Sequence, residues 1–379
     1  MNGERALDLV AGARPNFMKV APILRVLGAG PLSPRLVHTG QHYDEGMSGV
    51  FFRDLGIAEP DVYLGVGSGS HGQQTARILA AYEEHLVRTR PAAAVVVGDV
   101  NSTMACTLAA VKLGIPVAHV EAGLRSFDRT MPEEINRLVT DTLADLLLVS
   151  EPAGEENLRR EGIADGRIRY VGNVMIDTLV RELPGARALG VTERLGLPAG
   201  GFAYVTLHRP SNVDDPARLA RLADLLGALG ARLPVVFPVH PRTRERLRGT
   251  GLEGQLASAP GVLLLEPLGY RESLGLMAGA RLVLTDSGGV QEETSYLGVP
   301  CLTLRPNTER PVTVSLGTNV VVGEEIERAW PLIEEVLAGR HKAGRPIPGW
   351  DGHAAERVAA ALAERYGGQN RPAGPRDPG

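Results

Sequence analysis

The chain has few aromatic residues and no excess of basic charge. Phe, Trp and Tyr make up 4% of its 379 residues, and 40 Lys and Arg stand against 44 Asp and Glu, which gives a net charge of -4. Proteins that bind nucleic acid need basic patches and often stacking aromatic side chains, and an anionic membrane also attracts basic charge. We therefore expect neither nucleic acid nor a membrane as a partner.

Cysteines and long apolar runs are also scarce. The two cysteines, Cys106 and Cys301, lie far apart in apolar contexts, so we expect buried packing residues in a reducing compartment and no disulfide framework. No apolar run approaches the roughly 20 residues of a membrane-spanning helix, and the N-terminal MNGERALDLVAG lacks a signal-peptide core. These features predict a soluble, cytoplasmic protein.

Short apolar runs that each close on a glycine or a polar residue recur along the whole chain. They read, in order, LDLVAG, RLVHTG, AAAVVVGD, PVAHVEAG, DLLLVS, IRYVGN, AYVTLH, PVVFPVH, VLLLEP, RLVLTDSG, PCLTLR and NVVVG. Helix-period segments such as QQTARILAAYEEHLVRT lie between them. Continuous apolar strands that alternate with amphipathic helices are typical of parallel sheets covered on both faces.

This number of strands is too large for one ordinary open sheet, so the pattern predicts two doubly wound α/β domains. We place them at residues 1–175 and 176–351, because residues 181–201 are rich in glycine, proline and charge before strands resume at Phe202. A final amphipathic helix at about 352–367 is expected to pack back on the first domain. Residues 368–379 are expected to form a disordered tail.

Ligands of open α/β sheets bind beyond the carboxyl ends of the strands. The polar residues that follow the apolar runs are therefore candidate site residues, and a cleft between two such domains would collect them. They are Arg14, Lys19, Gln41, His42, Asp99 and Glu121 in the first half, and His208, Arg209, His240, Asp286 and Ser287 in the second half.

The stretch LTDSGGVQEETSYLG predicts a phosphate site. Glycines in a Ser287-Gly288-Gly289 turn let backbone N–H groups approach an anion, and the dipole of a helix that begins near residue 290 favours negative charge. Glu292 and Glu293, placed in the first helical turn, are able to accept sugar hydroxyls. The alternative is an ordinary strand-to-helix turn whose acidic residues complement the helix dipole.

Three basic side chains extend this prediction. His208 is positioned to donate to the same phosphates, although a single histidine at a strand end is more often a structural hydrogen-bonding group. The same alternative holds for His240. Arg310, in RPNTERPVT, is expected to pair with a carboxylate or a phosphate, and its alternative is a surface salt bridge.

Charged residues crowd the segment AHVEAGLRSFDRTMPEEINR. Glu121 directly follows an apolar strand and needs a partner or a chemical role there. Asp99 occupies the equivalent place on the neighbouring run, where local bonding to Ser102 is the alternative. Carboxylates that converge with arginines can differ in protonation state, as a paired acid and base require.

Glu133, in the same segment, has two purely structural explanations. Thr130 and Glu133 have the spacing of a capping box, with Pro132 suited to the first helical turn. Glu133 and Arg137 also have the spacing of an ion pair on a helix surface. The pattern alone leaves these explanations and a catalytic role open.

The chain resembles a known family in the blocks GARPNFMKVAPIL, TGQHYDEGMSGVFFRDLGI, VVGDVNST, HVEAGLRSFDRTMPEEINR, HRPSNVD, TDSGGVQEE and RPNTERPVT. In this order they are similar to the non-hydrolysing UDP-N-acetylglucosamine 2-epimerases. The likeness extends to about Gly323. It implies a glycosyltransferase-B architecture, in which two Rossmann-like domains face each other across a cleft.

The resemblance also implies roles for the candidate residues. Asp99, Glu121 and Glu133 would act as acid and base beside Arg137, and Arg14 and Lys19 would lie near the nucleotide. The other implied ligand-binding residues are His208, His240, Ser287, Gly288, Gly289, Glu293 and Arg310, with Gln41 and His42 where some members bind an activating second substrate molecule. The implied protein is a homodimeric isomerase that converts UDP-GlcNAc to UDP-ManNAc for polysaccharide synthesis. Because the sequence shows no metal-ligand cluster and the elimination of UDP needs none, we expect no metal or other cofactor.

One motif departs from the family pattern. Many bacterial members have His-Arg-Arg-Glu where this chain has His208-Arg209-Pro210-Ser211, a variant that also occurs among relatives that act on UDP-diacetamido-sugar uronates. Such a uronate is therefore the alternative substrate. Three competing hypotheses are a glycosyltransferase of the same fold, hydrolytic release of the sugar and a silent nucleotide-sugar-binding protein.

Overall fold

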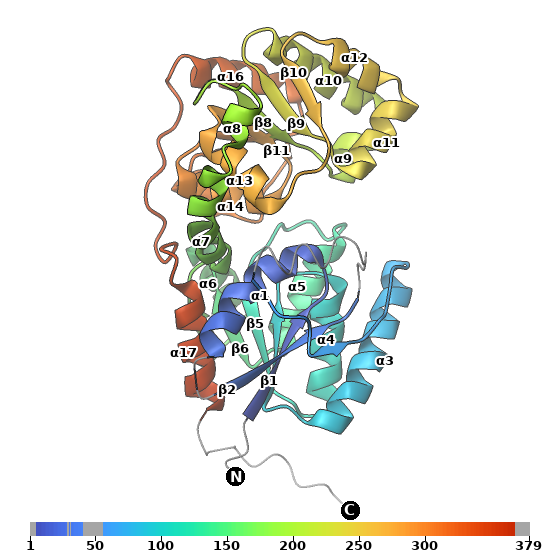
Figure 1. Cartoon of the computed structure of the whole chain (residues 1–379). Helices are drawn as coiled ribbons and strands as arrows, with labels where there is room; N and C mark the ends of the chain where they lie inside the picture. Colours follow the sequence, from blue (N-terminus) through green and yellow to red (C-terminus); the bar gives the residue numbers. More distant parts are fainter. Residues whose placement is uncertain (1–4, 29, 31, 41–55, 368–379) are drawn as a thin grey trace, which may run out of the picture. The chain divides into compact units, whose positions relative to one another are not determined.

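The computed structural model describes residues 5–28, 30, 32–40 and 56–367, except for the side chains of residues 5, 14 and 15. It divides into two compact units (Figure 1). Unit 1 takes its described residues from Met1–Thr178 and Pro348–Gly379, and unit 2 is Leu179–Ile347. Each unit is a parallel sheet with helices on its faces, as the alternation of apolar runs and helix-period segments predicts.

Unit 1 is built on a seven-stranded sheet in the order β3-β2-β1-β4-β5-β6-β7. Its strands are β1 Arg5–Ala11, β2 Leu32–His38, β3 Val62–Tyr63, β4 Ala93–Val97, β5 Val117–Ala122, β6 Leu146–Val149 and β7 Ile168–Tyr170. Its helices are α1 Arg14–Leu27, α3 His71–Thr89, α4 Asn101–Lys112, α5 Pro132–Leu143, α6 Pro152–Arg160, the short η1 Asp165–Arg167 and α17 Ala354–Tyr366. Helix α7, Val174–Ala188, begins in this unit.

Unit 2 is built on a six-stranded sheet in the order β10-β9-β8-β11-β12-β13. Its strands are β8 Ala203–Thr206, β9 Val235–Pro238, β10 Val262–Leu265, β11 Leu282–Thr285, β12 Cys301–Thr303 and β13 Asn319–Val321. Its helices are α8 Val191–Arg194, α9 Pro210–Val213, α10 Pro216–Gly230, α11 Pro241–Gly249, α12 Leu252–Ser258, α13 Tyr270–Gly279, α14 Gly288–Leu297, α15 Pro311–Ser315, η2 Ile326–Arg328 and α16 Ala329–Leu337.

Each sheet has one point at which the strand order reverses. In unit 1 the chain passes from β1 to β2 and β3 on one side, and from β4 to β5, β6 and β7 on the other, so β1 and β4 are neighbours. In unit 2 the same relation holds for β8 and β11. The loops that follow these two strands diverge to opposite faces of the sheet, which leaves a crevice for a ligand at the carboxyl ends.

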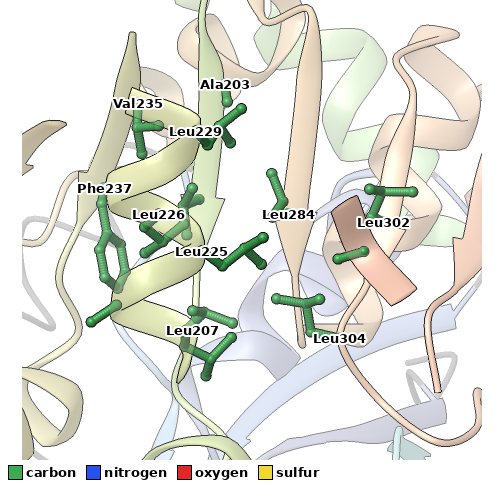
Figure 2. Close-up of a cluster of buried hydrophobic side chains, with 14 of the residues drawn as sticks. Ala203, Leu207, Leu225, Leu226, Leu229, Val235, Phe237, Leu284, Leu302 and Leu304 are labelled. Atoms are coloured by element: carbon green, nitrogen blue, oxygen red, sulfur yellow. The ribbon is translucent and has the colours of Figure 1, made fainter. Parts of the chain in front are cut away.

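The apolar runs are continuous because both faces of each sheet are covered. In β8, Ala203 and Val205 pack in one apolar cluster, whereas Tyr204 packs in the cluster on the opposite face. The first cluster also contains Leu226 and Leu229 of α10, which Figure 2 shows against the strands. Successive residues of a strand point to opposite faces, so a strand buried on both faces has no polar alternation.

The structure differs from the sequence-based expectation at two places. Strand β3 is not among the predicted runs. Only Val62 and Tyr63 pair with β2, and two residues are too few to form a recognisable apolar run. The unit boundary, between Thr178 and Leu179, is close to the predicted one at 175/176, but it lies inside α7, and this helix continues through Pro184 into the stretch rich in glycine and proline. The boundary is therefore not marked by a break in secondary structure.

The chain returns to unit 1 near its C-terminal end. Helix α17 packs against α1, and the backbone N–H groups of Ala354 and Ala355 donate to the Asp177 carboxylate at 3.0 and 2.6 Å. The segment before the helix is held as well, since Trp350 Nε1 donates to the Ser150 carbonyl at 2.9 Å. The predicted tail, 368–379, lies outside the described residues.

The cysteines and the helices agree with the apolar patterning of the sequence. Cys106 and Cys301 are both buried free thiols, as their apolar contexts predict. Within the part of the chain that the structure describes, every helix is too short or too polar to cross a lipid bilayer.

The burial of the sheet in unit 2 gives a first testable prediction. Leu284 in the central strand β11 has no exposed surface, whereas Leu263 in the edge strand β10 is 36% exposed. We expect Leu284→Ala to lower the free energy of unfolding by about 2–5 kcal/mol, because it removes buried surface and leaves a cavity. Leu263→Ala should cost less than about 1 kcal/mol. Urea unfolding of the two variants measures the difference, and equal costs would contradict the burial described here.

Candidate active site

Glu121 and Lys19 form an ion pair at the carboxyl edge of the sheet in unit 1. Glu121 lies near the end of β5 and Lys19 in α1, and their side chains are 7% and 12% exposed. Gly98, after β4, lies directly beside the pair: a Cβ there would be in ordinary contact with Glu121 Oε2 and Lys19 Nζ at 3.5 Å, and its φ is +73°. Only glycine adopts such a φ without strain.

Asp99 is the second carboxylate at this edge. Arg137 Nη2 in α5 donates to Asp99 Oδ2 at 2.5 Å, and Asn136 Nδ2 donates to the Asp99 carbonyl at 2.8 Å. The Arg137 side chain is 3% exposed, whereas that of Asp99 is 29% exposed. A buried guanidinium thus fixes a carboxylate that remains open to solvent.

The turn between β1 and α1 is tied to these residues by Asn16. Its Oδ1 accepts from the N–H groups of Gly12 and Ala13 at 3.1 and 2.9 Å, and its Nδ2 donates to the Val97 carbonyl at 3.0 Å. These bonds join the two strands at the topological switch point. Asn16 is not among the predicted site residues, because a polar residue early in a helix carries no specific signal in the sequence.

Three predicted residues in this unit stay predictions. Arg14 is the first residue of α1, but its side chain is not described. Gln41 and His42, the candidate activator site, lie outside the described residues.

Both structural explanations of Glu133 are wrong. Helix α5 begins at Pro132 with Met131 as its N-cap residue, so Thr130 does not cap it, and Thr130 bonds to Asp128 instead. Arg137 pairs with Asp99 and with Glu134, one residue further along than predicted. Glu133 itself is half-buried one helical turn before Arg137, and no described side chain pairs with it.

Glu134 is a structural residue that the sequence did not distinguish from Glu133. It is buried and accepts from the N–H groups of Ser126 and Phe127, both at 2.9 Å, and from Arg137 Nη1 at 2.8 Å. One carboxylate therefore joins the loop after β5 to the arginine that holds Asp99.

In unit 2, the fully buried Asp286 organises the loop that follows β8. Its carboxylate accepts from the N–H groups of His208 and Arg209 at 3.1 and 3.0 Å and from Asn212 Nδ2 at 3.0 Å. Burial alone would raise the pKa of Asp286, but the bonds from His208, Asn212 and the Arg209 backbone hold it below its ordinary value. These bonds cross the switch point between β11 and β8.

Asp286 also orients the His208 ring. His208 Nδ1 lies 3.1 Å from Asp286 Oδ1, so this nitrogen faces the carboxylate and leaves Nε2 for another partner. The side chain is 41% exposed. The ring centroid of His240 lies 5.6 Å away, and His240 Nδ1 caps α11 by accepting from the Arg242 N–H at 3.3 Å. His240 therefore has at least a structural role.

Helix α14 begins at Gly288, two residues earlier than predicted. Glu292 and Glu293 consequently lie in its second turn, so the explanation that they complement the dipole of the first turn is wrong. Gly288 cannot be replaced without a shift, because a Cβ would lie 2.9 Å from Arg310 Nη1 and 3.0 Å from Glu309 Oε1. Glycine at this position lets the charged groups pack directly beneath the turn.

Arg310 belongs to a buried network, which corrects the alternative of a surface salt bridge. Its Nε donates to Glu292 Oε1 at 2.5 Å and its Nη1 to Glu309 Oε1 at 2.9 Å, and its side chain is 7% exposed. Arg305 pairs with the other oxygen of Glu309 at 2.8 Å. This network fixes the position of Arg310 beside the Ser287-Gly288-Gly289 turn.

Glu293 is buried beside Tyr270, which donates its hydroxyl to Glu293 Oε1 at 2.8 Å. Burial raises the pKa of Glu293 to about 7, with a further contribution from the neighbouring Glu292, although the Tyr270 bond opposes the shift. A carboxylate with few bonds of its own in such a place is suited to accept hydroxyl groups from a ligand.

The two units thus hold different chemical groups. Unit 1 gathers carboxylates that are held by basic side chains, and carboxylates are groups that can transfer protons. Unit 2 places a histidine, a glycine turn at a helix N-terminus and a buried arginine together, as an anion requires. Among the residues that the structure describes, no group of three or more His, Cys, Asp and Glu has the arrangement of a metal site.

Comparison with known proteins identifies the family of the chain. A family model described as UDP-N-acetylglucosamine 2-epimerase matches residues 27–363. The chain is 40% identical over 361 residues to the UDP-N-acetylglucosamine 2-epimerase of Methanocaldococcus jannaschii, covering 94% of this chain and 98% of that protein. It is 42% identical over 323 residues to the UDP-2,3-diacetamido-2,3-dideoxy-D-glucuronate 2-epimerase of Pseudomonas aeruginosa, covering 83% of this chain and 87% of that protein.

Solved structures show the same likeness. The structure is similar to the crystal structure of the Methanocaldococcus jannaschii enzyme in complex with UDP-GlcNAc and UDP, with a TM-score of 0.87 over 95% of this chain and 99% of that chain. It is also similar to the Neisseria meningitidis UDP-GlcNAc 2-epimerase bound to UDP-GlcNAc, with 29% identity and a TM-score of 0.85 over 95% of this chain and all of that chain.

The surroundings of Glu293 predict a pH dependence of stability. The pKa of Glu293 rises from 4.5 to about 7 on folding, so the folded state binds this proton more tightly than the unfolded state. The stability that results is present below pH 4.5 and is lost as the pH rises to about 7. Glu293→Gln lacks this titration. The wild type should therefore lose stability over this pH range and the variant should not. We expect the free energy of unfolding of the variant, relative to that of the wild type, to rise by about 3 kcal/mol between pH 4.5 and 7.5.

Urea unfolding at a series of pH values measures this gain. Glu324→Gln, at an exposed position of the same unit, is the control. Equal pH profiles for the two variants would contradict the buried environment of Glu293.

Proposed function

Because this chain belongs to the UDP-N-acetylglucosamine 2-epimerase family, we propose that it interconverts UDP-N-acetylglucosamine and UDP-N-acetylmannosamine by inversion at C2. Similarity over nearly the full length of the Methanocaldococcus jannaschii enzyme supports the whole activity. The observation that carries the proposal is the pair of carboxylates, Asp99 and Glu121, at neighbouring strand ends. Each is held by a basic side chain, Arg137 or Lys19.

The chemistry explains why several carboxylates are needed. The C2 hydrogen of a sugar with an intact anomeric bond is not next to a carbonyl group, so simple removal of its proton is unfavourable. In the proposed reaction, loss of the C2 proton and departure of UDP from C1 give 2-acetamidoglucal. UDP then adds back to C1 while a proton is delivered to the opposite face of C2. One group must accept a proton and another must supply one.

We assign these proton transfers to Asp99, Glu121 and Glu133. The three carboxyl groups have different surroundings: Glu121 is buried against Lys19, Asp99 is partly exposed against Arg137, and Glu133 is half-buried without a described cation. An acid and a base that act in one site must be distinct groups, and these three carboxyl groups are not equivalent in their contacts. Arg137 is proposed to act beside these carboxylates, and Arg14 and Lys19 are proposed to lie near the nucleotide.

We assign the binding of UDP to unit 2. His208 Nε2, the Ser287 side chain and the backbone N–H groups of Gly288 and Gly289 are proposed to hold the diphosphate, with Arg310 and His240 beside it. Glu293 is proposed to accept the ribose hydroxyls. Holding the diphosphate matters for the reaction, since UDP must remain bound after it leaves C1 in order to add back.

A UDP-diacetamido uronate is the second candidate substrate. The 42% identity to the Pseudomonas aeruginosa enzyme supports it, as does the His208-Arg209-Pro210-Ser211 motif. The proposed chemistry at C2 is the same for both substrates. The groups that would contact the substituents at C3 and C5 decide between them.

We further propose that the enzyme is a cytoplasmic homodimer that supplies activated sugar for polysaccharide synthesis. The family resemblance is the support for these three statements. Gel filtration with light scattering tests the dimer, and a monomer at micromolar concentration would contradict it.

Isotope exchange tests the proposed reaction directly. Incubation with UDP-GlcNAc in deuterated water should place one deuterium at C2 of the UDP-linked product, visible by NMR and mass spectrometry. Free sugar as the product would indicate hydrolysis instead, and no deuterium with UDP-GlcNAc would contradict the proposal. Incorporation into the diacetamido uronate alone would establish the second candidate.

Substitution of the carboxylates tests their assignment. We expect Asp99→Asn and Glu121→Gln each to lower kcat by at least about 100-fold, because each removes a proton-transfer group, while the affinity for UDP measured by calorimetry stays within a few-fold. Asp165→Asn, an exposed position of unit 1, is the control. Near-normal turnover in either site variant would overturn its role.

A further inference from the structure

The backbone of Glu121 is in an unusual conformation. Its φ is +75°, and only two other non-glycine residues in the described part of the chain, Arg90 and Phe127, have a positive φ. The pairing of β5 with β6 shifts register between Val120 and Ala122, so Glu121 is left out of the ladder. A bulge of this kind turns a side chain in a new direction, and a left-handed non-glycine residue persists only where its surroundings enforce it.

Asp141 in α5 binds the chain on both sides of this residue. Asp141 Oδ1 lies 2.6 Å from His119 Nδ1, two residues before Glu121, and Asp141 Oδ2 accepts from the Gly123 N–H at 3.0 Å, two residues after it. Arg125 Nη1 lies 2.7 Å from the same Oδ2. Burial would raise the pKa of Asp141, but His119 and Arg125 hold it below its ordinary value, which keeps the carboxylate a strong acceptor.

The two residues that Asp141 binds are themselves fixed. His119 Nε2 lies 2.8 Å from the Gly98 carbonyl, directly before Asp99. Gly123 accepts from Asn157 Nδ2 at 2.9 Å, and a Cβ on Gly123 would lie 2.4 Å from the Gly154 carbonyl oxygen. The segment between them therefore has little freedom to relax.

We propose that Asp141 is a positioning residue that, through His119 and Gly123, forces Glu121 into its left-handed conformation and so aims the Glu121 carboxylate. The carboxylate then lies against Lys19 and Gly98, with Asp99 on the neighbouring strand end. This inference rests on the proposed function, because it deepens the role of Glu121 as a proton-transfer group.

The chain offers a matched control for Asp141. Asp8 in β1 is equally buried in the same unit and also has a histidine partner, His85, and an arginine partner, Arg35. Asp8 has no contact with the residues of the proposed site among those described. Loss of either carboxylate removes a buried charge network, but only Asp141 contacts the segment that bears Glu121.

We expect Asp141→Asn to lower kcat about 10- to 100-fold, because a small displacement of a reacting group has an effect of this size. The affinity for UDP should stay unchanged, since the proposed diphosphate groups lie in unit 2. Asp8→Asn should lower the melting temperature but leave the kcat of the folded enzyme within about 2-fold. Wild-type activity is measured first, so its absence would contradict the proposed function and not this inference.

A double-mutant cycle shows whether Asp141 acts through Glu121. In a Glu121→Gln background, Asp141→Asn should have little further effect on the residual rate, because the group that it positions is already absent. An undiminished loss in that background, or an unchanged kcat in Asp141→Asn alone, would overturn the proposal.

A second measurement leaves Asp141 in place, in case its replacement prevents folding. If the surroundings enforce a left-handed conformation at position 121, Glu121→Gly should be more stable than Glu121→Ala, with a melting temperature about 2–4 °C higher. An alanine variant that is as stable as the glycine variant would show that no such conformation is enforced, which would also overturn the proposal.

Discussion

Both units are organised by the same constraint: a carboxylate that is buried must be surrounded by donors or positive charge. In unit 2, the Asp286 carboxylate is met by two backbone N–H groups, an asparagine and a histidine from the loop after β8. In unit 1, Asp141 is met by His119, Arg125 and a backbone N–H. Each buried acid thereby fixes the backbone of a loop that carries candidate functional residues.

In each unit a buried polar side chain also bonds across the place where the topology leaves room for a ligand. Strands β1 and β4 in unit 1, and β8 and β11 in unit 2, are the neighbours between which the strand order reverses. Asn16 joins β1 to β4, and Asp286 joins β11 to β8. Hydrogen bonds therefore join the two strands at each switch point, and the partly exposed Asp99 carboxylate and the exposed His208 ring are held on fixed backbone.

Strain and close packing sharpen the two sites further. Gly98 has a φ of +73° beside Lys19 and Glu121, and a Cβ on Gly288 would lie only 2.9 Å from Arg310 Nη1. Glu121 has the conformation of a glycine but must carry a carboxylate. Its φ of +75° is thus a cost that the surrounding bonds must offset, and such costs are tolerated where they serve function.

The sequence predicted the sheets well and the site residues in part. The hydrophobic pattern of a buried strand can be read within that strand alone, so the apolar runs were recognisable in the sequence. The two-residue β3 has no such pattern and is defined only by its pairing with β2. The strand-end rule selected Asp99, Glu121 and His208, since it needs only the end of each run. It could not separate Glu133 from Glu134, or foresee that Arg310 is buried.

What the sequence alone determined is the family, the fold class and the set of polar residues that follow the strands, because these depend on local pattern and on the order of motifs. The tertiary structure decided which charges meet. Arg137 pairs with Asp99 rather than Glu133, and Asp141 reaches both sides of Glu121. The physical reason is that ion pairs and hydrogen bonds between distant segments depend on angstrom-scale distances, which exist only once helices and strands have packed.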